Sequence, residues 1–431
     1  MAIDDDDAFT VPWVPPAAAR LGLRVFRYLL RPRHFSQNAR LYLLGSMLMG
    51  LGHGAVWVHM NLYYRALGLG EGTIGRILSA GSLGTVLAAL PAAVWVDRVP
   101  AQAVFVAAAL GFVAALAAQL ATTNWAVLAL AAAITRALFT VHWVAAGPFF
   151  MRNAGERDRL DLFSFAMALE TLATVVSAAG VGALADALAR ASGSELHGLR
   201  LALLAAAAAA LLAVLPFARI RSGPPATARR AARDYFKARN WPLLGRLTLP
   251  AFLVGCGAGL IIPFLNLYFR DRFGQPPRAI GAYFSVAQLI TMLGFLAGPP
   301  IARRIGAVRA IVATELLSIP FFLILALARD LRLAVAAFWM RGALMNMNHP
   351  VSTSFSMSVV DPDDQTVTNS VRELAWNSAW MVSTQAGGVL IERAGYALPM
   401  FITMSLYAVA AALFFLFFGR MARATSSGRC P

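Results

Sequence analysis

The sequence is short of charge and of cysteine, and each shortage excludes a class of protein. Only 13% of its 431 residues are charged and 59% are apolar, against roughly a quarter charged in an ordinary globular chain. A soluble fold of this composition could not cover its surface with polar groups. The two cysteines, Cys256 and Cys430, exclude a disulfide scaffold and a cysteine-built metal site.

Lysine is almost absent, since Lys237 is the only lysine among the 37 basic residues. This skew accompanies alanine runs such as residues 205–210. It reflects genome composition more simply than a preference for guanidinium chemistry. The net charge of +16 is also typical of nucleic-acid-binding proteins, so the positions of the charges decide its meaning.

Signatures of catalysis are missing as well. The sequence contains no glycine-rich phosphate loop, no nucleophile paired with a base and no spacing of histidines that suits a three-ligand metal site. We therefore predict that the protein is not an enzyme and needs no cofactor or metal, and that ATP is not its direct energy source. The chain before residue 41 has no apolar stretch typical of a signal peptide, so we expect no cleavage there.

Long apolar runs are the most abundant feature of the sequence, and the mean hydropathy of the chain is +0.65. A run of about twenty residues crosses a hydrocarbon core of about 30 Å when it is helical. The fold class predicted is therefore an all-α integral membrane protein with twelve transmembrane helices. These helices are expected at residues 41–63, 74–95, 102–121, 125–150, 161–188, 198–218, 247–269, 279–301, 310–328, 333–358, 368–392 and 398–418.

The distribution of basic residues predicts the orientation. With a cytoplasmic N-terminus, 24 of the 37 basic residues fall on the cytoplasmic side, 10 fall outside and 3 lie within spans. By the positive-inside rule both termini are cytoplasmic. We expect a multi-pass protein of the cell membrane, with the bacterial inner membrane as its location, and basic cytoplasmic edges that contact lipid rather than nucleic acid.

The longest polar stretch divides the chain into two parts of six spans each. It contains three prolines and six basic residues between Ile220 and Gly245. The predicted organisation is a cytoplasmic tail, a six-helix bundle, a basic cytoplasmic linker, a second six-helix bundle and a cytoplasmic tail, at residues 1–40, 41–219, 220–245, 246–419 and 420–431.

The two halves repeat one another in sequence. The segment Asn61–Arg65, Asn-Leu-Tyr-Tyr-Arg, recurs as Asn266–Arg270, Asn-Leu-Tyr-Phe-Arg, at an offset of 205 residues. Arg136 matches Arg341 at the same offset, and glycines in several spans match at 205 or 206. A nearly constant offset over some 130 residues indicates two homologous halves in the same topology.

Twelve spans, a basic central linker and a parallel repeat of six helices resemble the major facilitator superfamily of secondary transporters. The resemblance covers nearly the whole chain from about residue 40. The family's signature between spans 2 and 3 is matched in part, by Asp97 and Arg98 but not by glycines at Ala93 and Pro100. The equivalent segment of the second half keeps Arg304 and Gly306, and it has Arg303 at the position where the signature has an acidic residue. The resemblance implies a gating role for Asp97, Arg98, Arg303, Arg304 and Gly306.

Two arginines are the first candidates for substrate binding. The resemblance implies that spans 1, 4, 7 and 10 line a central cavity, which places Arg136 and Arg341 on one chamber. Guanidinium groups bind carboxylate and phosphate in a bidentate manner, so such a pair suits an anion. Two alternatives remain open. Either arginine can instead pair with a carboxylate, and Arg136 also resembles an arginine often found in span 4 of the family's exporters.

Carboxylates within spans are candidates for proton coupling, because an ionisable group costs on the order of 2.5–3.5 kcal/mol there. Glu170 is the stronger candidate and Glu373 the second. Glu373 shares a helical face with Asn377, Trp380 and Thr384, a stripe that suits a cavity wall. A packing role for Glu373 is equally consistent with the sequence. Glu315 is a third carboxylate within a span.

The remaining substrate contacts are expected from polar and aromatic side chains on the same helices. Helical spacing puts His53, Trp57 and Asn61 on one face of span 1 and aligns Arg341 with Asn348 in span 10. Asn266 repeats Asn61, and Trp143 and Trp380 suit stacking on an organic substrate. Tryptophans in such spans can also face lipid, and a lone histidine there is more often a packing residue.

The predicted function is secondary active transport of a small organic solute by alternating access, coupled to protons and acting as a monomer. Export of an amphipathic, drug-like compound and uptake of an anionic nutrient are both consistent with these residues. An alternative is a sensor or assembly factor that has kept the fold without transport.

Overall fold

The computed structural model describes residues 35–96, 98–153, 159–221, 240–361 and 364–426, and all regular structure in them is helical. The helices of the N-terminal half are α2 (Gln37–Ala66), α3 (Glu71–Val96), α4 (Ala101–Ala121), α5 (Trp125–Asn153), α6 (Arg159–Ser192), α7 (Glu195–Leu211) and α8 (Val214–Ala218). Those of the C-terminal half are α9 (Trp241–Ile261), η3 (Ile262–Phe264), α10 (Leu265–Phe273), α11 (Pro277–Ile305), α12 (Ala307–Leu327), α13 (Leu331–Ser358), α14 (Gln365–Ala394) and α15 (Ala397–Ser426).

Short polar residues begin several of these helices. Ser36 accepts a hydrogen bond from the backbone N–H of Ala39, Asn240 from Leu243 and Asp330 from Leu333, at 3.2, 3.0 and 2.9 Å. Each cap satisfies one of the free N–H groups of a first helical turn. These caps therefore help to fix the residues at which α2, α9 and α13 begin.

The predicted spans are confirmed as helices. Each of the twelve predicted ranges falls on a helical segment, and nine segments in the described part of the chain are long and apolar enough to cross a membrane. The helices α3, α13 and α14, of 26, 28 and 30 residues, complete an arrangement consistent with twelve spans. Most of the predicted tails and linker, together with Asp97, lie outside the described residues.

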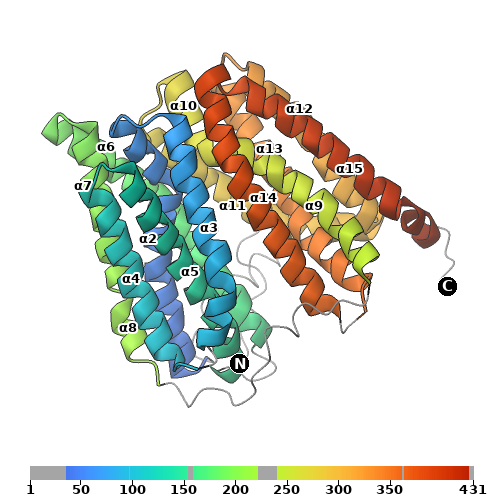
Figure 1. Ribbon diagram of the computed structural model, residues 1–431, viewed down its shortest axis with the longest axis horizontal. Coiled ribbons are helices and arrows are strands. Elements are labelled where there is room, and N and C mark those ends of the chain that lie inside the picture. The colour runs from blue at the N-terminus through green and yellow to red at the C-terminus, as the bar shows by residue number, and fades with distance from the viewer. Residues whose placement is uncertain (1–34, 97, 154–158, 222–239, 362–363, 427–431) are drawn as a thin grey trace, which may run out of the picture.

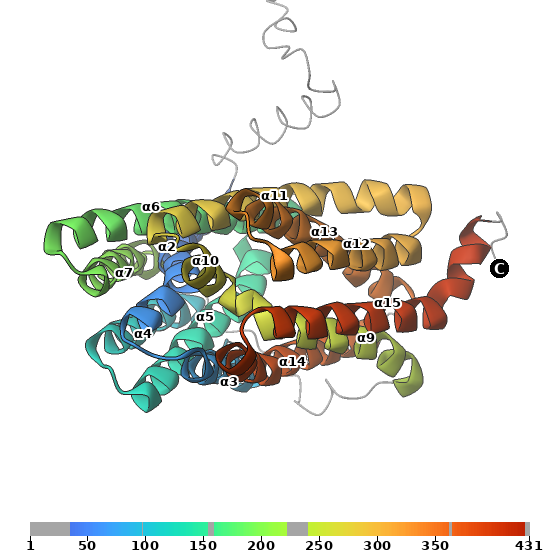
Figure 2. The same ribbon diagram turned by 90° about the horizontal axis from the view of Figure 1, so that it is seen from above.

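The two halves lie side by side (Figure 1), and two pairs of helices join them. Helix α3 packs against α14, and α6 packs against α11. Viewed from above, these pairs lie on opposite edges of the molecule, with α2 and α10 between them (Figure 2). We call the side that carries Arg221 and Asn240 the linker side and the opposite side the far side.

Equivalent residues of the two halves make equivalent hydrogen bonds, as the sequence repeat predicts. The Tyr63 hydroxyl donates to the carbonyl oxygen of Leu120 at 3.2 Å, and the Tyr268 hydroxyl donates to that of Leu325 at 2.6 Å. Both residues of the second bond lie 205 positions after those of the first. The offset of 205 residues in the sequence therefore corresponds to a pseudo-twofold relation between the two halves of the structure.

Close contacts between the halves gather on the far side. Asn61 Nδ2 donates to the Pro263 carbonyl at 2.6 Å, and Asn266 Nδ2 donates to the Val58 carbonyl at 2.8 Å. The two amides also contact one another at 3.3 Å. The matched segments Asn61–Arg65 and Asn266–Arg270 thus meet at the pseudo-twofold axis, where each supplies the other with a hydrogen bond.

Charged side chains add further links on the far side. Arg65 lies 3.2 Å from Glu71 and 3.6 Å from Asp271, and Arg270 lies 2.8 Å from Glu195. Tyr396 donates to Asp271 at 2.7 Å, and burial and this carboxylate raise the pKa of Tyr396, which keeps it a donor. The bonds from Arg65 to Asp271 and from Arg270 to Glu195 both cross between the halves. The far side is therefore closed in this structure, whereas the helices diverge toward the linker side (Figure 1).

Candidate functional site

A cavity of about 440 Å³ lies between the two halves. Its wall takes side chains from α2, α3 and α5 of one half and from α9, α11, α13 and α14 of the other. This volume falls within the range of small-molecule sites. Because both halves supply the wall, a ligand bound here contacts both, and a movement of one half against the other changes its contacts.

Two arginines carry the charge of the cavity wall within the described residues. Arg136 and Arg341 both line the cavity, and no Asp or Glu of the described chain lines it. Arg341 is 5% exposed, its guanidinium carbon lies 5.3 Å from the ring centre of Phe322, and its Nε has no hydrogen-bond partner in the described chain. Neither arginine forms an ion pair within the part of the chain described here. The predicted meeting of the two arginines on one chamber is thus what the structure shows.

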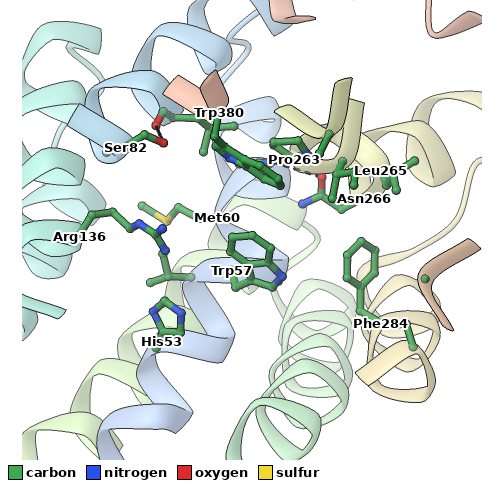
Figure 3. Close-up of a pocket in the computed structure, with 18 of the residues that line it drawn as sticks. His53, Trp57, Met60, Ser82, Arg136, Pro263, Leu265, Asn266, Phe284 and Trp380 are labelled. Atoms are coloured by element: carbon green, nitrogen blue, oxygen red, sulfur yellow. Dashed lines mark hydrogen bonds between the residues drawn. The ribbon is translucent and has the colours of Figure 1, made fainter. Parts of the chain in front are cut away.

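Aromatic side chains form the apolar part of the wall. Trp57 is 41% exposed and lies near the centre of the view in Figure 3, between Arg136 on one side and Phe284 on the other. Trp376 and Trp380 also line the cavity, with their ring centres 6.0 Å apart. His53 stacks on Phe139 at 3.7 Å while it faces the same space. The wall therefore offers flat surfaces beside guanidinium groups.

Asn61 and Asn266 line the cavity and also hold the far-side junction. They are 4% and 2% exposed. Both side chains are used by hydrogen bonds between the halves, so each would have to exchange partners when the far side opens. The cavity wall thus includes seven of the residues selected from the sequence, and their binding roles remain predictions: His53, Trp57, Asn61, Asn266, Arg136, Arg341 and Trp380.

The structure corrects two predicted substrate contacts. Trp143 and Asn348 do not line the cavity. Trp143 Nε1 donates to Glu170 at 3.2 Å, and Asn348 Nδ2 donates to Glu315 at 3.0 Å. The two donors are equivalent in the repeat, and each follows its cavity arginine by seven residues, about two helical turns. Their side chains turn away from the cavity because each satisfies a glutamate inside the bundle.

Glu170 lies beside the main cavity rather than on its wall. It borders a small pocket of about 10 Å³ together with Tyr42, Ser46, His142 and Trp143. A pocket of that size is near the lower limit for one water molecule. The Tyr42 hydroxyl and His142 Nε2 lie 3.2 Å apart on the same pocket. Glu170 thus has polar neighbours and room for a proton donor or acceptor.

Glu373 has a different setting. Its side chain is exposed, and it is not part of the cavity wall. Of the predicted stripe on α14, Trp380 lines the cavity, while Thr384 is buried and Asn377 donates to the backbone of Glu373 at 2.8 Å. The expectation that this stripe forms a cavity wall is correct only at Trp380.

The sequence matches the Major Facilitator Superfamily over residues 42–384, and a second, overlapping match covers residues 247–429. The chain belongs to the Major Facilitator Superfamily. The resemblance stated from the sequence is confirmed. Among curated proteins, no sequence matches this superfamily member.

Solved structures show the same fold at low sequence identity. A bacterial homologue of the human lysosomal transporter Spinster, inward-facing and unoccupied, is 14% identical, with a TM-score of 0.74 over 93% of this chain and 99% of that one. The nucleoside transporter NupG is 15% identical, with a TM-score of 0.72 over 90% and 99%. A bacterial homologue of the iron transporter ferroportin gives 0.71 in its inward-facing state, at 15% identity over 88% and 98%. The structure of a ferroportin homologue in the outward-facing state gives a TM-score of 0.59, at 16% identity over 89% of this chain and 100% of that one.

The family's signature positions lie on the linker side. Arg98, Arg303 and Arg304 are exposed there, and Gly306 links α11 to α12 with a φ of +88°. That left-handed backbone suits glycine because it has no Cβ. Asp97 lies outside the described residues. The helices of the two halves diverge on the linker side (Figure 1), and the gating roles of these residues remain predictions.

Several polar residues of the cavity wall were not singled out from the sequence of this superfamily member. Gln288, Thr291 and Asn346 line the cavity with Phe284 and Ser82. Phe284, Gln288 and Thr291 occur at steps of four and three on α11, so helical periodicity could have placed them on one face. The missing information was which face of α11 meets the other half.

Proposed function

We propose that the protein is a secondary transporter of small organic anions that carry a flat apolar body. The observation that carries this proposal is the pair of arginines, one from each half, on a cavity wall to which the described residues contribute no carboxylate. A guanidinium at this depth without an ion pair attracts an anion strongly, because little water competes with it. The exposed Trp57 ring and the Trp376–Trp380 pair supply the surfaces on which an apolar body would stack.

The position of the arginines on opposite halves supports transport rather than sensing. An anion bound by both guanidinium groups links the two halves. Each half can keep its contact with the anion while one half moves against the other. The distribution of basic residues supports a cytoplasmic linker side. The higher TM-score against the inward-facing state of the ferroportin homologue supports a cytoplasm-open state.

Thermal stabilisation of the purified protein tests the proposal directly. We expect indole-3-acetate and benzoate to stabilise it, by about 2.7 kcal/mol at a hundredfold excess over Kd. The neutral amides of the same acids should stabilise it far less, because they keep the ring and lose the charge. Equal stabilisation by acid and amide, or by neither, would contradict an anion-binding cavity. The measurement is the melting temperature in detergent as a function of ligand concentration.

We further propose that Glu170 couples transport to protons. Protonation of Glu170 removes a negative charge from the half that holds Arg136, which strengthens the attraction of the cavity for an anion. A proton and an anion would then bind together. Positive coupling of this kind favours uptake of the anion together with protons over export of the anion in exchange for protons. The pocket beside Glu170 and its bond from Trp143 support this assignment.

The variant Glu170→Gln separates proton coupling from anion binding. We expect uptake of indole-3-acetate driven by a pH gradient to fall at least about tenfold, while exchange of labelled for unlabelled anion persists, because the glutamine cannot release a proton. Asp186→Asn, on the same helix nearer the far side, is the matched control and should keep gradient-driven uptake. Proteoliposomes with an imposed pH gradient provide the assay. Full gradient-driven uptake by Glu170→Gln would remove this residue from the mechanism.

A further inference from the structure

A second buried carboxyl group lies in the C-terminal half and has no part in the function proposed so far. Glu315 on α12 is 5% exposed, and its Oε1 accepts a hydrogen bond from Asn348 Nδ2 at 3.0 Å. Its Oε2 has no hydrogen-bond partner in the described chain, and neither has Asn348 Oδ1. Two unpartnered acceptors therefore belong to two side chains that already contact each other.

One proton would satisfy both acceptors. A carboxylic acid and a primary amide can form two hydrogen bonds, in which the amide donates to the carbonyl oxygen and the acid O–H donates to the amide oxygen. The first of these bonds is present. The second needs a proton on Glu315 Oε2, directed at Asn348 Oδ1. An ionised Glu315 would instead leave a buried charge with a single partner, which is the more costly arrangement within a membrane.

The groups around Glu315 link it to the cavity. Helix α13 contributes Arg341, which is buried on the cavity wall, and α15 contributes Tyr407, which lines the cavity and interacts electrostatically with both Arg341 and Glu315. The charged residues at the end of α11, Arg303 and Arg304, are exposed on the linker side, as is Arg309 at the start of α12. Arg341 is the cavity cation on the helix that also carries Asn348, the hydrogen-bond partner of Glu315.

We propose that Glu315 and Asn348 form a second proton-binding site, whose occupancy controls the affinity of Arg341 for the transported anion. The proposal rests on the anion-transport function proposed above and assigns to it a second coupled proton. With the proton bound, Glu315 carries no negative charge, and the positive charge of Arg341 is available to the substrate. With the proton lost, the Glu315 carboxylate lowers the positive potential at the wall, and the anion is released more readily.

The two proton sites are related but not equivalent. Trp143 and Asn348 occupy matching positions of the repeat, but Trp143 offers only a donor to Glu170. Asn348 offers both a donor and an acceptor, so only the C-terminal site can form the paired acid–amide arrangement. The donor of each carboxyl follows its arginine by seven residues in the direction of the linker side.

Infrared spectroscopy of the full-length protein tests the proton site without any substrate. At neutral pH we expect a protonated-carboxyl C=O band that Glu315→Gln removes and Glu170→Gln leaves in place. Glutamine can keep both bonds to Asn348, so the variant should fold, with its melting temperature as the check. Asn348→Leu should shift the frequency of the band, because it removes the amide that is hydrogen-bonded to Glu315 and keeps the Glu315 carboxyl group. Absence of the band, or its persistence in Glu315→Gln, would overturn the proposal.

The pH dependence of indole-3-acetate affinity tests the coupling. In the wild type, the affinity for indole-3-acetate should fall as the pH rises. In Glu315→Gln, the slope of the logarithm of this affinity against pH should be smaller by one, because one proton fewer binds with the anion. An unchanged slope with the band removed would make the proton structural and overturn the coupling. If the wild type binds no aromatic carboxylate at all, the anion-transport proposal fails, and the infrared result still decides whether Glu315 holds a proton.

Discussion

Arg136→Ala and Arg341→Ala should each weaken the binding of aromatic carboxylates at least about thirtyfold. Removing one partner of a desolvated charge pair costs about 2–5 kcal/mol, and each 1.4 kcal/mol is a factor of ten in Kd. The structure places both guanidinium groups on the cavity wall with no ion pair in the described chain, so neither has a protein carboxylate that it must release first. Binding to purified protein and flux in proteoliposomes measure the two effects.

Lysine variants show which property of each arginine is used. Arg136→Lys and Arg341→Lys keep the charge and lose the planar fork, so a bidentate contact predicts an affinity between those of wild type and alanine. The matched control is Arg76→Ala, which removes an exposed arginine 5.9 Å from the ring of Trp125 on the far side. Wild-type anion flux in both alanine variants, with the proteins folded, would exclude the two arginines as the anion site.

Gly182→Leu should prevent the far side from closing and should reduce transport at least about tenfold. A Cβ atom at Gly182 would lie 2.5 Å from the Pro277 carbonyl oxygen and 3.0 Å from His59 Cε1. The oxygen belongs to the backbone at the start of α11, so it cannot move aside as a flexible side chain can. Overpacking of this kind typically costs 1–3 kcal/mol. That cost corresponds to a shift of roughly 5- to 150-fold in the equilibrium between the two conformations.

The neighbouring glycine provides a matched control for this substitution. A Cβ atom at Gly180, two residues earlier on α6, would meet nothing within 4 Å. Gly180→Leu should therefore leave both the conformation and transport unchanged. Spin labels at Arg190 and Arg278, in a chain with both cysteines replaced, report the separation of α6 and α11 on the far side. An unchanged separation in Gly182→Leu would show that the junction tolerates the side chain.

How far the sequence predicts this site depends on the residue. Arg136 and Arg341 could be placed together, because the repeat and the family resemblance assign their helices to the cavity. Trp57 and Trp143 could not be separated, although one is on the cavity wall and the other holds Glu170 inside the bundle. Both are tryptophans near the middle of a cavity-lining helix, and composition does not distinguish their directions.

The same limit applies to the carboxylates. Glu373 lies on a stripe of suitable periodicity and is exposed, whereas Glu315 has no such stripe and is buried against Asn348. Pairing of this kind joins α12 and α13, at positions 33 residues apart. A periodic pattern within one helix carries no information about a partner on another helix.

By itself, the sequence determined the membrane environment, the extents of the helices, the division into two repeated halves and the two arginines that distinguish the cavity. The first three follow from apolar length, charge distribution and a constant offset, which are properties of the chain in one dimension, and the placing of the two arginines follows from the family resemblance. Only the tertiary structure decided which face of each helix meets the cavity, which side of the molecule is closed and which residue holds each buried carboxyl group. The physical reason is that lipid and protein interior are about equally apolar, so a membrane helix carries only a weak sequence record of the face that it buries.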